Sequence, residues 1–330
     1  KVFGVSAISE DIIAPSCFMG LSSHTSSSNV QPMTLVVDLG QSGSRARIDG
    51  KHINSLRGKL AGEPPLSSLR AVFESIEKLR ADTVALSCTG FRGIVTDPQP
   101  FLALCNEFFG ANTVAVIDDG LAGFIGALGG GNGVVLSIGG GVVSVGRNGT
   151  HFAHRDGLES TFGDEGGGFW LGKLGLTRAL GIRQGRGDDQ ILLETFKEQV
   201  FAYDALAIKN ATEAASLAIA SAKNLLAAAD AGSPTAIAIR NEGAALLAQT
   251  VIATWLGAGG SLDDAPEIAI QGGPSKNPAY VSAIQSNISR SLPKAKFVSA
   301  RGDNLDGALW IANNMPNDAE PLLRWAVKSI

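Results

Sequence analysis

With 330 residues, the chain is long enough for two domains of ordinary size and a deep cleft. Its hydrophobic fraction of 45%, its 18% of charged residues and its 41 glycines are typical of a globular protein with many tight turns. A formal net charge of −4 provides no basic footprint for nucleic acid or an anionic membrane, so we expect a small-molecule partner.

The N-terminal region lacks the periodicity of folded elements. Residues 1–33 show neither a helical nor a strand pattern and include a serine-rich cluster at 22–29, which predicts a disordered extension over 1–33. The sequence shows no basic region followed by an apolar core, as a signal peptide would, and no apolar run of the roughly 18 residues that a membrane span needs. We therefore expect a cytoplasmic protein without a membrane partner.

Cysteines and histidines follow no metal-binding or disulfide pattern. Cys17, Cys88 and Cys105 are an odd number at wide spacings, which fits neither a disulfide framework nor a zinc site and suits the cytoplasm. His151 and His154 lack metal-ligand spacing, and we interpret them as polar strand or loop residues.

The predicted folded body begins with a β-hairpin. An apolar run from Leu35 closes at a glycine, and an alternating segment then leads to Asp49-Gly50, which predicts a hairpin over 35–50. Strands that alternate with helices after it indicate an α/β sheet. These elements are a helix at 66–79, a strand at 83–86, a helix at 101–108 and a strand at 113–117.

A second hairpin, at 134–149, copies the first. It has the same length, and its glycine and its turn dipeptide match those of the first hairpin at a constant offset of 99 residues. We therefore predict an internal duplication, with one domain at 34–131 and a similar one at 132–330. The elements expected in the second domain are a glycine-rich segment at 163–175, an insertion of Ala-rich helices at 203–257 and a strand at 268–270.

Both hairpin turns have the properties of phosphate-binding loops, because phosphate oxygens need many donors and little side-chain bulk. A single strand-Asp-x-Gly hairpin is usually only a turn. Two equivalent loops, however, could hold one polyphosphate from both sides. The first loop would use Asp38 for a metal, through water, and Gly40, Gln41, Ser42 and Ser44 for phosphate; the second would use Gly139, Gly140 and Gly141.

Two adjacent carboxylates stand where the strand at 113–117 leads into a helix. Asp118 or Asp119 could cap that helix through its N-terminal amides. A carboxylate in a cleft could instead orient an attacking hydroxyl and take its proton. We interpret one of the two as the cap and the other as the catalytic group.

Two later segments join glycines to the starts of helices. Asp164 and Glu165 precede three consecutive glycines, each costing about 1 kcal/mol relative to alanine inside a helix, so we expect a close backbone approach there. An Asp-Glu pair is also common at a helix N-terminus for dipole reasons alone. Gly272-Gly273 follows a strand and either presents a flat surface to an adenine ring or serves only as a turn.

In this order the motifs resemble those of the acetate and sugar kinase, heat-shock protein and actin superfamily. Residues 163–166 (Gly-Asp-Glu-Gly) with Phe-Trp-Leu-Gly at 169–172 are similar to the N-acetylglucosamine kinase branch, also described as the BadF/BadG/BcrA/BcrD ATPases. The resemblance covers about residues 34–315. It implies an α/β protein of two ribonuclease-H-like domains, of the actin and sugar-kinase type, with an interdomain cleft.

The resemblance also implies an activity, the ATP-dependent phosphorylation of a small sugar, with N-acetylglucosamine or a related amino sugar as the acceptor and Mg²⁺ as the cofactor beside ATP. It would make Asp119 the catalytic base and the two hairpin turns the phosphate loops, with Mg²⁺ near Asp38. Gly272 and Gly273 would lie against the adenosine, and Thr89, Gly90, Asp119, Asp164 and Glu165 would face the sugar.

Three positions depart from the family pattern. Gly-Gly-Gly-Val at 139–142 stands where the family has Gly-Thr-Gly-Ser, and the loss of two hydroxyls would weaken or redirect activity. Gly-Leu-Glu at 157–159 replaces Gly-Trp-Gly, and the asparagine that contacts the amino sugar has no counterpart near 62–65. These departures leave the identity of the sugar open.

Two other functions stay open from the sequence. An ATP-driven activator of a radical dehydratase needs cysteines in glycine-rich motifs that join two subunits through an iron–sulfur cluster, and neither Cys88 nor Cys105 has such neighbours. A non-catalytic ATP or sugar sensor would agree with the missing hydroxyls of the second loop. The sequence also leaves open whether the protein forms a homodimer.

Overall fold

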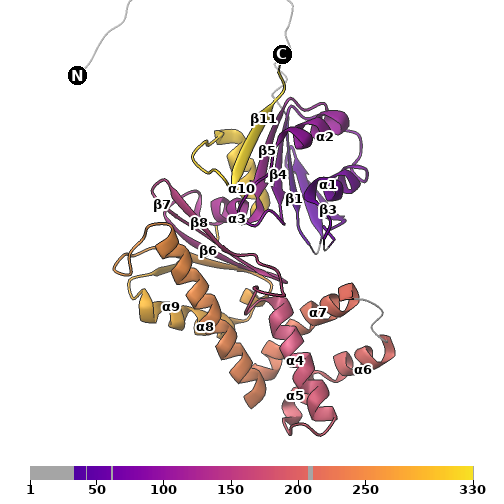
Figure 1. Cartoon of the computed structure of the whole chain (residues 1–330), viewed down its shortest axis with the longest axis vertical. Helices are drawn as coiled ribbons and strands as arrows, with labels where there is room; N and C mark the ends of the chain where they lie inside the picture. The colour runs from indigo at the N-terminus through magenta and orange to yellow at the C-terminus, as the bar shows by residue number, and fades with distance from the viewer. Residues whose placement is uncertain (1–32, 42, 61, 207–210, 330) are drawn as a thin grey trace, which may run out of the picture. The chain divides into compact units, whose positions relative to one another are not determined.

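The computed structural model describes residues 33–41, 43–60, 62–206 and 211–329, and Figure 1 labels most of their helices and strands. Apart from Met33, the extension predicted over 1–33 lies outside the described residues. Within the described part, six strands form the first sheet, in the order β11-β5-β4-β1-β2-β3. They are β1 (Thr34–Leu39), β2 (Ser44–Ile48), β3 (Lys51–Leu56), β4 (Thr83–Cys88), β5 (Thr113–Asp118) and β11 (Leu323–Val327).

The central strands of this sheet are apolar because both of its faces are covered. β1, β4 and β5 run parallel, and residues on both of their faces are buried. Leu35 and Val37 pack toward α1 (Pro65–Phe73) and α2 (Gln99–Phe109), whereas Val36 packs toward α3 (Asp119–Leu128) and α10 (Asn304–Asn314). Figure 1 shows these two helix pairs on opposite faces of the sheet.

Helix α1 is shorter than the predicted helix at 66–79. It ends at Phe73, and the next residues form i-to-i+3 turns. The hydroxyl of Ser75 donates to the carbonyl oxygen of Val72 at 2.7 Å, and a serine that competes in this way for a backbone carbonyl favours a helix end. Ile76 still reaches the core, which explains why the apolar spacing continues past the helix.

The second sheet repeats the topology of the first, as the predicted duplication requires. In each, a hairpin is followed by a third antiparallel strand that the sequence pattern did not predict, and the first strand of the hairpin pairs in parallel with a later strand. The order among the described residues is β10-β9-β6-β7-β8, formed by β6 (Gly133–Ile138), β7 (Val142–Asn148), β8 (His151–Asp156), β9 (Glu267–Gly272) and β10 (Lys296–Val298).

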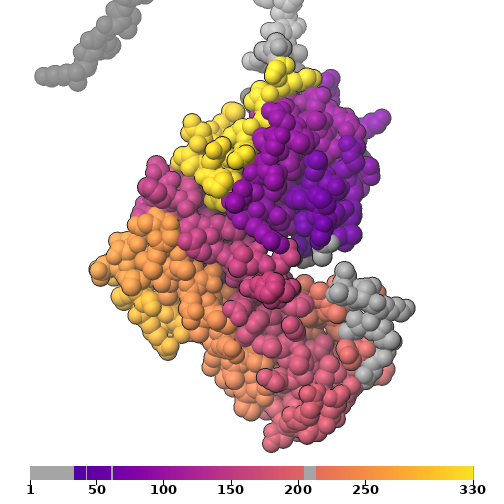
Figure 2. Space-filling view, viewed as in Figure 1, coloured from indigo at the N-terminus to yellow at the C-terminus, as the bar shows by residue number. Residues whose placement is uncertain are grey.

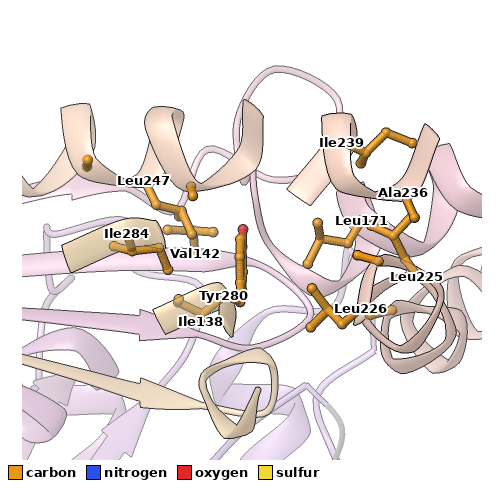
Figure 3. Close-up of a cluster of buried hydrophobic side chains, with 14 of the residues drawn as sticks. Ile138, Val142, Leu171, Leu225, Leu226, Ala236, Ile239, Leu247, Tyr280 and Ile284 are labelled. Atoms are coloured by element: carbon orange, nitrogen blue, oxygen red, sulfur yellow. The ribbon is translucent and has the colours of Figure 1, made fainter. Parts of the chain in front are cut away.

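Helices cover the outer face of the second sheet and enclose the largest apolar core. Figure 3 shows Ile138 and Val142 of this sheet packed with Leu247 and Tyr280, whose hydroxyl donates to the carbonyl oxygen of Gly166 at 2.7 Å. None of the described helices combines the length and apolarity needed to cross a membrane. The helices on this side are α4 (Gly168–Arg183), α5 (Gln190–Thr195), α6 (Lys197–Leu206), α7 (Ala211–Asp230), α8 (Pro234–Gly257) and α9 (Pro278–Ser291), with a 3-10 turn at Pro274–Lys276.

The chain returns to the first sheet near its C-terminal end. β11 pairs antiparallel with β5, and α10 packs on α3, so these residues lie with the first sheet although the sequence assigned all of 132–330 to the second domain. Figure 2 shows this yellow segment directly beside the indigo and purple surface of the first sheet. The physical reason is that β5 would otherwise be an open edge of unpaired backbone groups, a requirement that local periodicity does not encode.

Helices α3 and α10 cross between the two sheets with their backbones in close contact at two glycines. A Cβ on Gly307 would overlap the carbonyl oxygen of Ala122, and one on Gly126 would overlap that of Asp303. The core around this crossing contains residues of both sheets, including Val36 of β1 and Val135 of β6. The crossing therefore sets how the two sheets face each other.

We expect Gly307→Ala to destabilise the protein by about 1–3 kcal/mol, because the added methyl group must push two packed backbones apart. Thermal unfolding measures the effect. Gly181→Ala in α4 is the matched control, since its Cβ would meet ordinary contacts at 3.8 Å and alanine favours a helix interior by about 1 kcal/mol. Equal melting temperatures for the two variants would contradict a tight crossing.

Candidate active site

A cavity of about 780 Å³ lies where the carboxyl ends of strands from both sheets meet. The residues that follow β1, β4, β5, β6 and β9 reach it, in agreement with the usual position of ligand sites in α/β sheets. Ten of the predicted site residues line it: Gln41, Thr89, Gly90, Asp119, Gly139, Gly140, Gly141, Asp164, Gly272 and Gly273.

One of the two adjacent carboxylates caps helix α3, as the sequence predicted. Asp118 is the N-cap of α3 and is buried; its Oδ1 accepts from the amide of Gly120 and its Oδ2 from that of Gly93, both at 3.0 Å. Asp119 is the first helical residue and is partly exposed on the cavity wall. With Asp118 committed to backbone amides, Asp119 is the carboxylate that can meet a ligand.

Asp119 has an unusual protonation equilibrium. Burial, and then the negative charges of Asp118 and Asp38, raise its pKa to about 7, while a hydrogen bond from Thr89 and the nearby His154 act in the opposite direction. Burial penalises the charged form of a carboxyl group, and neighbouring carboxylates do the same. A carboxyl group with a pKa near neutrality in a cavity has the properties of a general base.

The second glycine loop is held from behind by helix α4. The amide of Gly168 donates to the carbonyl oxygen of Gly139, and the amide of Phe169 donates to that of Gly140, both at 2.8 Å. Because a trans peptide places its N–H opposite its carbonyl, the amides of Gly140 and Gly141 point away from α4. They are therefore available to a ligand in the cavity, as a phosphate loop requires.

The close approach predicted at the glycine run is this same contact. A Cβ on Gly168 would lie 2.7 Å from the carbonyl oxygen of Gly139, and one on Gly167 would lie 3.2 Å from that of Gly140. Gly166 adopts a φ of +82° against α8, where a Cβ would meet Leu247. The loop and the helix start thus fit together only without side chains.

Asp164 lies at the junction between this loop and the cavity. Its Oδ1 accepts from the amide of Val142 at 2.9 Å, and its own amide donates to Asp156 at 2.9 Å. Burial raises the pKa of Asp164, with smaller contributions from Asp156 and Glu159, and the Val142 hydrogen bond opposes them. Its neighbour Glu165 is exposed and does not line the cavity, so of this predicted pair only Asp164 is placed to contact a ligand.

The first loop is arranged differently from the sequence expectation. The hydroxyl of Ser44 donates to the carbonyl oxygen of Arg57 at 2.6 Å and is buried away from the cavity. Gly40 forms the turn without lining the cavity, and Gln41 does line it. Ser42 lies outside the described residues.

Asp38, the predicted metal ligand, is surrounded by donors. Its Oδ2 accepts from Arg45 at 2.7 Å, and its Oδ1 accepts from Ser87 at 2.9 Å and from Asn304 at 3.3 Å. It does not line the cavity. In the described part of the chain, no group of three or more acidic, histidine or cysteine side chains is arranged to hold a metal ion.

Several cavity residues were missed by sequence reasoning. Lys59 follows β3, a strand that was not predicted, and Arg92 pairs with Glu159 at 2.7 Å from the opposite sheet. His154 lies on β8, as a strand residue, with its Nε2 3.5 Å from Asp118. No local spacing marks these residues, because they come together from distant segments of the chain. The sequence signal nearest to any of them was the departure from the family pattern at Gly157-Leu158-Glu159.

Comparisons with solved structures show the fold. A candidate N-acetylglucosamine kinase from Chromobacterium violaceum aligns with a TM-score of 0.61 at 19% identity, covering 85% of this chain and 99% of that chain. A second one, from Porphyromonas gingivalis, gives 0.62 at 15% identity over 86% and 100%. A ROK family glucokinase from Streptomyces griseus, in complex with glucose and AMPPNP, gives 0.50 at 18% identity over 86% and 98%. The predicted two-domain α/β fold of the actin and sugar-kinase type is confirmed.

The sequence comparisons identify a family but no individual curated relative. A search of curated proteins found no match. The sequence model of one family matches residues 33–309, which is most of the chain. This chain belongs to the BadF/BadG/BcrA/BcrD ATPase family.

Proposed function

We propose that the protein is an ATP-dependent kinase that phosphorylates a hydroxyl group of a small sugar, with N-acetylglucosamine or a related amino sugar as the first acceptor to test. The observation that carries the proposal is the position of Asp119, a carboxyl group with a pKa of about 7 in a cavity that also presents the amides of the second glycine loop. The family is one of ATPases, and the similar folds include candidate N-acetylglucosamine kinases.

In this proposal Asp119, Thr89 and Asp164 each have one task. The sugar hydroxyl donates a hydrogen bond to Asp119, which takes its proton as the oxygen attacks the γ-phosphorus. A new O–P bond forms, the bond between the γ-phosphorus and the bridging oxygen breaks, and ADP leaves. Thr89 orients Asp119, and Asp164 accepts hydrogen bonds from other sugar hydroxyls.

Gly272 and Gly273 support an adenosine site at the other side of the cavity. Gly272 has a φ of +105°, and a Cβ there would overlap the carbonyl oxygen of Ile138. Gly273 has no atom within 4 Å of the position of a Cβ. Gly272 thus packs closely against β6 and Gly273 is open, and together they leave a surface without side chains, which suits a stacked ring.

Magnesium enters the proposal together with ATP. A carboxylate has about four acceptor positions, and the three donors on Asp38 leave it room to accept from a water of the metal's hydration shell. Mg²⁺ usually keeps several waters and binds through one or two carboxylates and the phosphates, so Asp38 fits a water-mediated contact. When bound, Mg²⁺ neutralises charge on the phosphates.

A sugar panel in a coupled assay for ADP release tests the function. We expect turnover that depends on an amino sugar or a hexose. Turnover with no sugar of the panel, combined with tight ATP or sugar binding by calorimetry, would favour a sensor instead. Cys88 and Cys105 are buried outside the cavity, which argues against an iron–sulfur activator; purified protein that contains iron would contradict this argument.

The activity should rise with pH. Because Asp119 must be deprotonated to accept a proton, and its pKa is about 7, we expect kcat/KM for the sugar to fall about tenfold for each pH unit below roughly pH 6 and to level off above 8. The measurement is kcat/KM from pH 5.5 to 9 at saturating ATP. A profile that is flat over this range, as a base with the ordinary pKa of an aspartate would give, would contradict the assignment of Asp119 as the base.

A further inference from the structure

The two glycine loops contain no cationic side chain. Residues 40–44 (Gly-Gln-Ser-Gly-Ser) and 139–142 (Gly-Gly-Gly-Val) hold neither lysine nor arginine. Phosphoryl transfer, however, depends on positive groups that neutralise charge on the transferred phosphoryl group. If the protein transfers phosphate, any side-chain cation that adds to the charge of Mg²⁺ must reach the cavity from another segment.

Two of the four lysine and arginine side chains that line the cavity already have a carboxylate partner. Arg45 is paired with Asp38 at 2.7 Å and with Asp303 at 2.6 Å. Arg92 is paired with Glu159. Charge that is neutralised within the protein is of little use to a phosphate.

Two lysines remain on the cavity wall, and they lie on opposite sides. Lys276 is exposed in the turn after Gly272 and Gly273, on the adenosine side of the proposed site. Lys59 is partly buried and lies on the side of the first loop. Among the described residues no carboxylate forms an ion pair with Lys59. Its Nζ donates a hydrogen bond of 3.5 Å to the carbonyl oxygen of Leu60.

The backbone of Lys59 is fixed to the first loop. Its amide donates to the carbonyl oxygen of Gly40 at 2.9 Å. The preceding Gly58 lies so close to the loop that a Cβ there would overlap the carbonyl oxygen of Gln41. Any ligand that contacts this loop is therefore within reach of the Lys59 side chain.

The side chain of Lys59 extends from the first loop toward the acceptor side. Gly90, which has a φ of +99°, leaves room for the Lys59 side chain because it has no Cβ. A Cβ on Gly90 would be 2.9 Å from Lys59 Cε and 3.4 Å from Lys59 Nζ. Gly90 follows Thr89, the residue that hydrogen-bonds Asp119. The ammonium group thus lies against Gly90, one residue from the Thr89 that hydrogen-bonds the proposed base.

We propose that Lys59 binds the γ-phosphoryl group of ATP and neutralises its charge during transfer. The proposal rests on the proposed function and adds a residue to it. A lysine ammonium supplies three donors and a full positive charge, which a cavity wall of glycine amides lacks. Lys59 should contribute little to the binding of ADP, which has no γ-phosphoryl group.

Calorimetry with AMPPNP and with ADP, each with Mg²⁺ and without sugar, tests this role. We expect Lys59→Met to weaken AMPPNP binding about tenfold and to leave ADP binding nearly unchanged, because one charge-assisted hydrogen bond is lost. Lys59→Arg should restore most of the AMPPNP affinity. Lys51→Met is the matched control, since Lys51 is exposed at the start of β3, the strand that precedes Lys59, and lies outside the cavity.

The outcomes separate this proposal from the function on which it rests. Equal AMPPNP affinity of Lys59→Met and the wild type, or an equal loss for both nucleotides, overturns the role of Lys59. A wild-type protein that binds neither nucleotide overturns the proposed function and this role together. A selective loss of AMPPNP binding in a protein that phosphorylates no sugar supports Lys59 and refutes the sugar kinase.

Discussion

Asp119→Asn lowers kcat for sugar phosphorylation by about a thousandfold and leaves nucleotide binding nearly unchanged. This is the expected result if Asp119 takes the proton of the attacking hydroxyl, because asparagine keeps the size and the hydrogen-bonding capacity of the side chain but cannot act as a base. Single-turnover measurements with the best sugar of the panel give the rate. Asp188→Asn is the control, since Asp188 is exposed and lies outside the cavity.

The same substitution should stabilise the protein at alkaline pH. The folded-state pKa of about 7 is above the unfolded value for Asp, so the folded state holds the proton more tightly. This contribution to stability is fully present below about pH 4 and is lost as the pH rises through about 7. Asparagine carries no proton to lose, so the melting temperature of Asp119→Asn minus that of the wild type should be about 3 °C higher at pH 8 than at pH 5. Wild-type activity in Asp119→Asn contradicts the catalytic role. A difference in melting temperature from the wild type that is no larger at pH 8 than at pH 5 contradicts the protonation argument.

Asp164→Asn raises the KM for the sugar by about a hundredfold, with a much smaller change in kcat. The amide oxygen of asparagine can still accept from the amide of Val142, and asparagine tolerates the φ of +58° found at this position. What is lost is the negative charge that faces the cavity and its hydrogen bonds to sugar hydroxyls. Steady-state kinetics with sugar and ATP varied separately measure the effect.

Asp164→Ala distinguishes binding from support of the loop. Alanine loses the bond to Val142 and is strained at a positive φ, so this variant should also melt at a lower temperature and bind ATP more weakly. An unchanged sugar KM in Asp164→Asn would mean that the carboxylate serves the loop alone.

The repeated hairpins illustrate what a sequence can predict. Both were found from local patterns, since a glycine and a turn dipeptide recur at matching positions and the strands between them are apolar. The prediction that one of Asp118 and Asp119 caps the helix is also confirmed, because the end of a strand and the start of a helix leave one carboxylate for the amides. Local rules decide both features.

The features that were missed depend on long-range pairing. Whether the hydroxyl of Ser44 turns to a ligand or to the carbonyl oxygen of Arg57 is decided by where the chain returns after β3. Lys59 reaches the first loop by the same return, and the Arg92–Glu159 pair joins segments of different sheets. A sequence pattern shows which residue types are present, but not which of them meet across such distances.

The pairing of β11 with β5 has a consequence for synthesis on the ribosome. Helices α1 and α2 and strands β1 to β5 emerge early, yet the strand that completes their sheet is made roughly 200 residues later. Domains are usually able to fold in the order in which they are translated. Here the nascent first sheet would keep an exposed, apolar edge at β5 until β11 has left the exit tunnel, so the two halves of this protein finish folding together.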